Sequence, residues 1–116
     1  MNIQVESQKN RRIVHIDGKI TFEHCPVFKN RLDAVSAEKG VREVVIDFGQ
    51  VPFLDSSGVG EILRLFKRMR ELDGKVVLMN PNRKLRDLFQ MYHFDRFMKI
   101  CEETELDKDK AEPSGG

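Results

Sequence analysis

Two hydrophobic patterns of different period meet at the stretch VPFLDSSGVG, residues 51–60. Before it, residues 44–46 form a continuous apolar run, which is typical of a strand that is covered on both faces. After it, from Val59 to Leu72, apolar residues recur at the spacing of an amphipathic helix. The stretch therefore predicts a polar turn that leads from a buried strand into a helix, with Ser56 as the helix N-cap.

The segments on either side of this turn also alternate between strand and helix patterns. The chain opens with two short strand patterns that are separated by a polar turn, which predicts a hairpin. Pro26 is compatible with the first turn of a helix and Gly40 with the end of one. The predicted elements are strands within 2–6, 13–16, 41–48 and 75–79 and a last strand near Ile100, with helices from Thr21 or His24 to Gly40, from Val59 to Leu72, and after Asn80 or Asn82.

This order of elements, ββαβαβαβ, predicts an α/β fold in which helices pack on a mixed sheet with a leading hairpin. The strand–helix–strand unit over residues 44–79 implies a right-handed crossover between parallel strands. The length of 116 residues suits one domain, which we expect to cover residues 1–101. The charged segment 102–116 is predicted to be a mobile tail.

Composition excludes several classes of protein. The formal net charge of +1 lacks the basic excess of a dedicated nucleic-acid binder, so we predict no direct contact with nucleic acid. No apolar run approaches the roughly 20 residues of a membrane-spanning helix, and the N-terminus is polar. We therefore expect a soluble cytoplasmic protein that makes no direct membrane contact.

The cysteine and histidine residues do not group at the spacing of metal ligands. Cys25 and Cys101 are far apart in the sequence, and the three histidines are scattered. Both cysteines are expected to be reduced thiols, because no signal peptide directs the chain to an oxidising compartment. We predict neither a metal site nor a cofactor, and we interpret Cys25 as a small, partly buried residue.

The polar turn does not match the common catalytic loops. A nucleophilic serine needs a base within reach, but His93 is the only histidine downstream and no Gly-x-Ser-x-Gly elbow is present. Gly58 and Gly60 precede a helix, as in phosphate-binding loops, but the Walker lysine and the GxGxxG pattern are missing. We therefore predict that the protein is not an enzyme, and that both glycines permit close packing of the helix against the sheet.

Two further roles for Ser56 are compatible with each other. As an N-cap, its hydroxyl would stabilise the helix by about 0.5–2 kcal/mol. As a phosphoacceptor, it would place a phosphate at the positive end of the helix dipole, which tolerates negative charge. The added charge, next to Asp55, would then repel whatever binds this surface. The residues alone leave both roles open.

The residues 44–48 and 51–60 resemble the signature of STAS domains, and in particular that of bacterial anti-sigma factor antagonists. The resemblance extends over about residues 3–101, because segments 85–89 and 94–100 suit the last helix and strand of that family. The Asp-Ser-Ser-Gly motif between this strand and this helix is its most specific part.

The resemblance implies a phosphorylation switch in transcription regulation. A family antagonist binds an anti-sigma factor, which is a serine kinase of the GHKL type, and thereby releases the sigma factor. The kinase phosphorylates the serine that directly follows the motif aspartate, here Ser56 with Ser57 as the second choice, and a PP2C-type phosphatase removes the phosphate. By the same resemblance, the docking surface is expected to comprise Thr21, Asp55, Ser56, Ser57, Gly58 and Val59.

One position departs from the family pattern. Many antagonists carry an aspartate in the loop before the first helix, where this sequence has Thr21. STAS domains also serve as unphosphorylated accessory subunits of ABC transporters and as scaffolds of stress signalling. This is the alternative function, although the intact Asp-Ser-Ser-Gly motif favours the phosphorylation switch.

Overall fold

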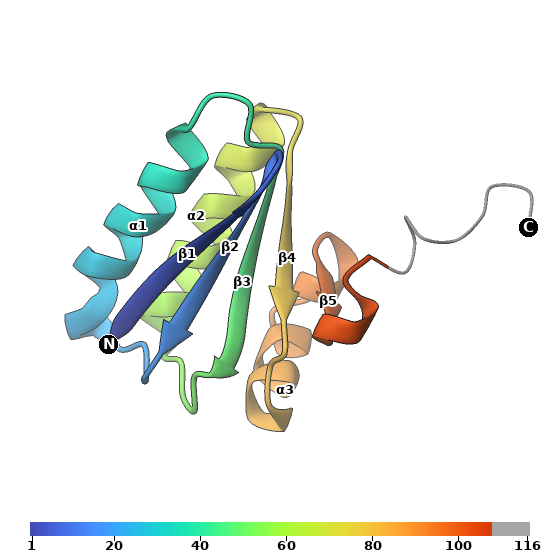
Figure 1. The fold of residues 1–116 in the computed structure, drawn as a ribbon. Helices are drawn as coiled ribbons and strands as arrows, with labels where there is room; N and C mark the ends of the chain where they lie inside the picture. Colours follow the sequence, from blue (N-terminus) through green and yellow to red (C-terminus); the bar gives the residue numbers. More distant parts are fainter. Residues whose placement is uncertain (108–116) are drawn as a thin grey trace, which may run out of the picture.

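The computed structural model describes residues 1–107 and confirms the predicted order ββαβαβαβ (Figure 1). Short 3₁₀ turns, named η, accompany the regular elements. The strands are β1 (Asn2–Gln8), β2 (Arg11–Asp17), β3 (Glu43–Gln50), β4 (Lys75–Met79) and β5 (Lys99–Cys101). The helices are α1 (Cys25–Ala37), α2 (Ser56–Glu71) and α3 (Arg83–Met91), and the 3₁₀ turns are η1 (Phe22–His24), η2 (Phe94–Arg96) and η3 (Glu103–Glu105).

The five strands form one mixed sheet in the order β1-β2-β3-β4-β5. The leading hairpin pairs β1 with β2 in antiparallel fashion, and β2, β3, β4 and β5 are parallel to their neighbours. Parallel strands end at the same edge of a sheet, so the loops that follow β2, β3 and β4 lie together there (Figure 1). This edge holds the turn that contains Ser56.

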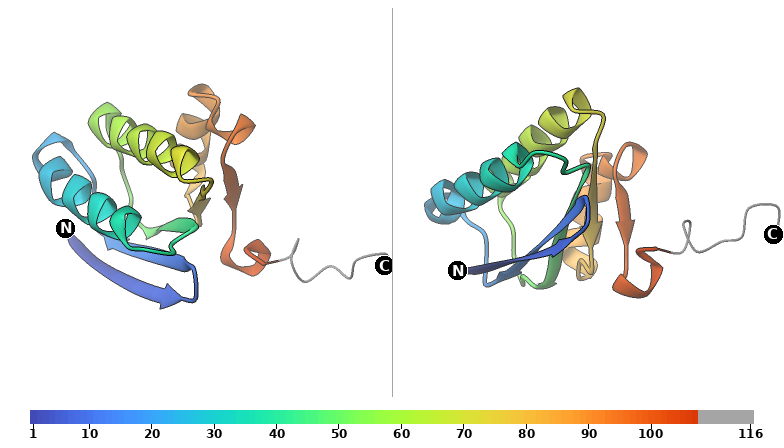
Figure 2. Two further views of the ribbon diagram at one scale, coloured as in Figure 1. Left: turned by 90° about the horizontal axis from the view of Figure 1, so that it is seen from above. Right: turned by 45° about the horizontal axis from the view of Figure 1, so that its top comes forward.

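The helices cover one face of the sheet, and α1 and α2 lie side by side over it (Figure 2). Successive residues of a strand point to opposite faces. Val44 and Ile46 of β3 accordingly pack under the helices in the main core, together with Ile62 and Met69 of α2. Val45 points the other way, into a smaller apolar cluster that also contains Ile13, Val77, Met79 and Cys101.

The domain extends beyond the predicted boundary at Cys101. Residues 102–107 were expected in a mobile tail, but they fold back onto the second face of the sheet as η3 and its three flanking residues, Glu102, Leu106 and Asp107. Leu106 packs against the smaller apolar cluster, and Asp107 forms an ion pair with Arg11 of β2. These contacts join positions far apart in the sequence, which is why the charged composition of the segment misled the prediction. The rest of the predicted tail, residues 108–116, lies outside the described residues.

Other features of the described residues bear on the predicted classes. Cys25 is half-buried and Cys101 is buried, and both are free thiols. Within residues 1–107, no three histidine, cysteine or acidic side chains gather as metal ligands. No helix in this part of the chain has both the length and the apolar character needed to cross a membrane.

Candidate functional site

The loop between β3 and α2, residues 51–55, is anchored by apolar side chains that point inward. Val51 and Leu54 are buried, whereas Pro52 and Phe53 between them face solvent. The neighbouring loop after β2 runs alongside, because the backbone N–H of Ile20 donates to the Phe53 carbonyl (2.9 Å) and that of Asp55 donates to the Ile20 carbonyl (3.1 Å). The two loops therefore form one continuous surface at the sheet edge.

The N-cap of α2 is Asp55, so the prediction that Ser56 caps this helix is wrong. The Asp55 Oδ1 atom accepts hydrogen bonds from the backbone N–H groups of Ser57 (3.0 Å) and Gly58 (3.2 Å). Its Oδ2 atom accepts a third from the backbone N–H of Phe22 (2.9 Å). Aspartate caps helices as well as serine does, and its second oxygen gives it a bond that a serine hydroxyl in the same place could not add.

Ser56 is instead the first residue of α2, and its side chain is exposed. Ser57 follows as a half-buried residue. Within residues 1–107, the Ser56 hydroxyl forms no side-chain hydrogen bond. The first turn of α2 contains no acidic residue, so Asp55 is the negative charge nearest to this hydroxyl along the helix end. The hydroxyl is therefore accessible at a helix N-terminus, where a negative group is favourable.

Gly58 and Gly60 differ in their surroundings, although the sequence predicts one role for both. A Cβ on Gly58 would clash with the Leu54 side chain and would lie 3.1 Å from Cγ2 of Ile20. A Cβ on Gly60 would meet no atom within 4 Å, so its predicted packing role is wrong. Gly58 thus lets α2 approach both loops closely. Gly58 and Val59 are buried, so we assign them to the support of the loop rather than to an accessible docking surface.

Thr21 lies at the start of η1, on the loop beside Asp55. Its backbone N–H donates to Nδ1 of His24 (3.3 Å), and its hydroxyl lies 3.0 Å from the same nitrogen. Thr21 is half-buried by these local contacts. Thr21 lies beside the loop that carries Asp55, Ser56 and Ser57, because Ile20 pairs with Leu54 and the Phe22 N–H donates to Asp55. That these residues form a docking surface stays a prediction.

Sequence reasoning missed the exposed aromatic residues of this edge. Phe22, in η1, is 77% exposed, and Phe53, in the loop after β3, is 51% exposed. Phe22 also lines a shallow groove of about 390 Å³, together with Cys25, Pro26 and Glu61. The signal available was a phenylalanine within a polar turn, but sequence alone does not show whether such a ring faces the core.

The Cys25 thiol in this groove is not activated. Partial burial raises its pKa, and the nearby carboxylates of Asp55 and Glu61 raise it further. A thiol with a raised pKa is a poor nucleophile at neutral pH. This edge therefore presents an exposed hydroxyl, two exposed phenylalanines and the Asp55 carboxylate, without an activated nucleophile at Cys25.

Comparison with known proteins places this surface in context. The sequence model of a family described as the STAS domain matches residues 2–106. An anti-sigma-B factor antagonist of Listeria monocytogenes is 32% identical over 104 residues, which cover 86% of this chain and 90% of that protein. The match includes nearly all of the folded chain.

Two solved structures share the fold. An anti-sigma-factor antagonist (STAS) domain protein from Planctomyces limnophilus has a TM-score of 0.82 at 19% identity, covering 94% of this chain and 97% of that one. The Bacillus cell fate determinant SpoIIAA in its phosphorylated form has a TM-score of 0.74 at 21% identity, covering 94% and 99%. At these identities the likeness establishes the arrangement of strands and helices.

Proposed function

Because this chain belongs to the STAS domain family, we propose that it is an anti-sigma factor antagonist controlled by phosphorylation of Ser56. In this proposal, unphosphorylated protein binds an anti-sigma factor that is a GHKL-type serine kinase, and the sigma factor is released. Phosphorylation by that kinase separates the pair, and a PP2C-type phosphatase restores binding. The protein itself catalyses no reaction.

The observation that carries the proposal is the exposure of the Ser56 hydroxyl at the first position of α2, directly after the capping Asp55. Its backbone lies at the positive end of the helix dipole, so a phosphate there should leave the fold intact. The docking surface includes Thr21, Asp55, Ser56 and Ser57, together with the exposed rings of Phe22 and Phe53.

The physical effect of the phosphate falls on the partner. Phosphorylation adds about 1.5 to 2 negative charges beside the Asp55 carboxylate. A partner that covers both groups must remove them from water and bring its own polar groups near them. Burying unmatched charge at an interface costs about 2–5 kcal/mol, which is enough to separate a complex of moderate affinity.

The test combines site mapping with binding by matched variants. The protein is incubated with the serine-kinase anti-sigma factor from the same organism and ATP, and the phosphorylated residue is identified by mass spectrometry. We expect phosphate on Ser56 in the wild type and none in Ser56→Ala, while Ser57→Ala is still phosphorylated. Ser56→Asp should bind the kinase at least tenfold more weakly than Ser57→Asp, with both variants folded by circular dichroism.

Two outcomes would contradict the proposal. Phosphate on another residue would remove Ser56 as the switch. Tight binding that is indifferent to Ser56→Asp would favour the alternative, an unphosphorylated accessory subunit or scaffold of a transporter or stress-signalling complex. The departure from the family pattern at Thr21, where many antagonists carry aspartate, is the observation that supports this alternative.

A further inference from the structure

Residues 102–107, which we name the C-terminal strap, cross the face of the sheet that the helices leave uncovered. Its single apolar residue, Leu106, packs against a cluster of side chains from four strands. All members of this cluster are at most 4% exposed, although no helix covers them: Ile13, Val45, Val77, Met79 and Cys101. The strap therefore contributes to the burial of a face that would otherwise be open.

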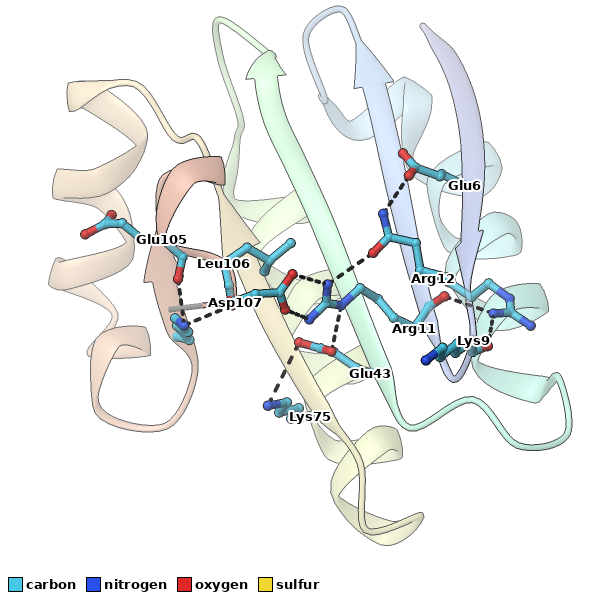
Figure 3. A network of polar contacts seen from close by, with 11 residues as sticks. Glu6, Lys9, Arg11, Arg12, Glu43, Lys75, Glu105, Leu106 and Asp107 are labelled. Carbon is cyan, nitrogen blue, oxygen red and sulfur yellow. Dashed lines mark hydrogen bonds and ion pairs between the residues drawn. The ribbon is translucent and has the colours of Figure 1, made fainter. Parts of the chain in front are cut away.

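The strap is joined to the sheet through a buried arginine (Figure 3). The Arg11 side chain, on a residue that is 5% exposed, donates two hydrogen bonds to Asp107, from Nη2 to Oδ1 (2.5 Å) and from Nη1 to Oδ2 (3.1 Å). Its Nε donates to Oε1 of Glu43 (2.8 Å). Glu43 keeps Arg11 paired on the sheet side, so Asp107 is the partner that links this cation to the strap.

Further strap contacts within residues 1–107 are polar, and one of them is an ion pair between Arg86 of α3 and Glu102 (3.2 Å). The Lys99 ammonium donates to the carbonyls of Glu105 (3.1 Å) and Leu106 (3.2 Å), and the backbone N–H of Glu103 donates to Oδ1 of Asn80 (2.8 Å). Water can replace each of these bonds when the strap lifts. The apolar surface lost from burial is then that of Leu106 and the cluster beneath it. Segments with few apolar contacts open at lower free energy than the whole domain.

We propose that the C-terminal strap is a cover that opens locally while the sheet stays folded, and that the Arg11–Asp107 ion pair is its latch. Cys101 lies immediately before the strap, and its thiol is 3% exposed within the cluster beneath Leu106. Opening the strap uncovers this thiol together with the apolar second face of the sheet. Reaction of Cys101 with a thiol reagent therefore reports how often the cover is open.

The experiment measures alkylation of the full-length protein by iodoacetamide, with Cys101 and Cys25 followed separately by peptide mass spectrometry. Asp107→Asn removes the charge from the latch but leaves Arg11 its bond to Glu43. We expect it to raise the Cys101 rate about tenfold or more, since charge-assisted bonds contribute more than neutral ones. The matched control Asp87→Asn, at an exposed carboxylate of α3, should leave the rate unchanged. Cys25, far from the strap in the sequence, should react equally in all three proteins.

Two further measurements separate local opening from unfolding. In low concentrations of urea the Cys101 rate should change much less than the rate of global unfolding, because opening the strap exposes one face of the sheet whereas unfolding exposes the whole core. Leu106→Ser, which removes the apolar contact, should also raise the Cys101 rate. The proposal is overturned if Asp107→Asn and Asp87→Asn react alike, or if the wild-type rate follows urea with the slope of global unfolding.

Discussion

The carboxylate of Asp55 accepts a hydrogen bond from the backbone N–H of Phe22, which precedes it by 33 positions (2.9 Å). The other carboxylate oxygen caps α2 through Ser57 and Gly58. One side chain thus fixes both the helix that carries the candidate phosphoacceptor and the turn that carries the most exposed phenylalanine.

Replacing Asp55 should separate these two roles. Asp55→Ala loses the cap and the bond to Phe22, and we expect it to lower the free energy of unfolding by about 1–3 kcal/mol. Asp55→Asn keeps one carbonyl oxygen for the cap, so its loss should be smaller. Urea denaturation monitored by circular dichroism measures the loss in unfolding free energy for both variants. Equal losses for the two variants would show that the bond to Phe22, not the cap, dominates.

The two glycines of α2 provide a matched pair for packing. Gly58→Ala places a methyl group against Leu54 and Ile20, and overpacking of this kind should destabilise the protein by about 1–3 kcal/mol. Gly60→Ala adds a methyl group in open space within a helix, which should stabilise by up to about 1 kcal/mol. Thermal unfolding of both variants checks the contrast. If Gly58→Ala leaves the melting temperature unchanged, the loop must shift to accommodate the methyl group.

The exposed ring of Phe22 should matter for binding and little for folding. Under the proposed function, Phe22→Ser is expected to weaken kinase binding by about tenfold or more, because aromatic anchors dominate interface energies. Met91→Ser, at the end of α3, is the control because Met91 is 65% exposed but distant in sequence from the Ser56 loop. Isothermal titration calorimetry of both variants, with their melting temperatures, tests this. Comparable binding by both would remove Phe22 from the docking surface.

His15 should make stability depend on pH. Its ring forms hydrogen bonds with two carboxylates, from Nδ1 to Oδ2 of Asp47 (2.7 Å) and from Nε2 to Oε1 of Glu6 (3.0 Å). Burial lowers the pKa of His15, but these two carboxylates outweigh burial and raise it overall. Because the pKa of His15 is raised in the folded state, its contribution to stability is fully present below the unfolded pKa of about 6.5. This contribution is lost as the pH rises through the folded-state pKa.

Wild type and His15→Gln should therefore differ most in unfolding free energy near pH 6, and the difference should shrink toward pH 8.5. Urea denaturation across this range measures the trend, and an NMR titration of the His15 ring gives the pKa directly. A difference that stays constant with pH would mean that the ring acts through packing alone.

Much of this fold could be predicted from the sequence, because its apolar periods are clear. The continuous run at 44–46 marked a strand buried on both faces, and it is so buried, with Val44 and Ile46 under the helices and Val45 in the second cluster. The helical spacing after Val59 likewise placed Ile62 and Met69 in the core. Such patterns depend on neighbours along the chain and can be read locally.

Features that depend on distant partners could not be predicted in this way. In the Asp-Ser-Ser-Gly motif, both Asp55 and Ser56 are residue types that cap helices well. Asp55 is the cap in the structure, and it also accepts a hydrogen bond from Phe22 in a distant turn, which the sequence does not reveal. The strap showed only a charged composition, and its place in the domain depends on Arg11, which lies 96 positions before Asp107. For the same reason the exposure of Phe22 and Phe53 became visible only in three dimensions.

The pairing of the loops around Ile20 and Phe53 has a consequence for substrate recognition. Ser56 lies on a surface assembled from two separate parts of the chain, so under the proposed function the kinase would contact a folded surface and not a stretch of consecutive residues alone. A synthetic peptide spanning residues 50–62 contains the whole motif but lacks the second loop. Such a peptide should be a far poorer kinase substrate than the folded domain, and comparing their phosphorylation rates would show whether recognition is conformational rather than linear.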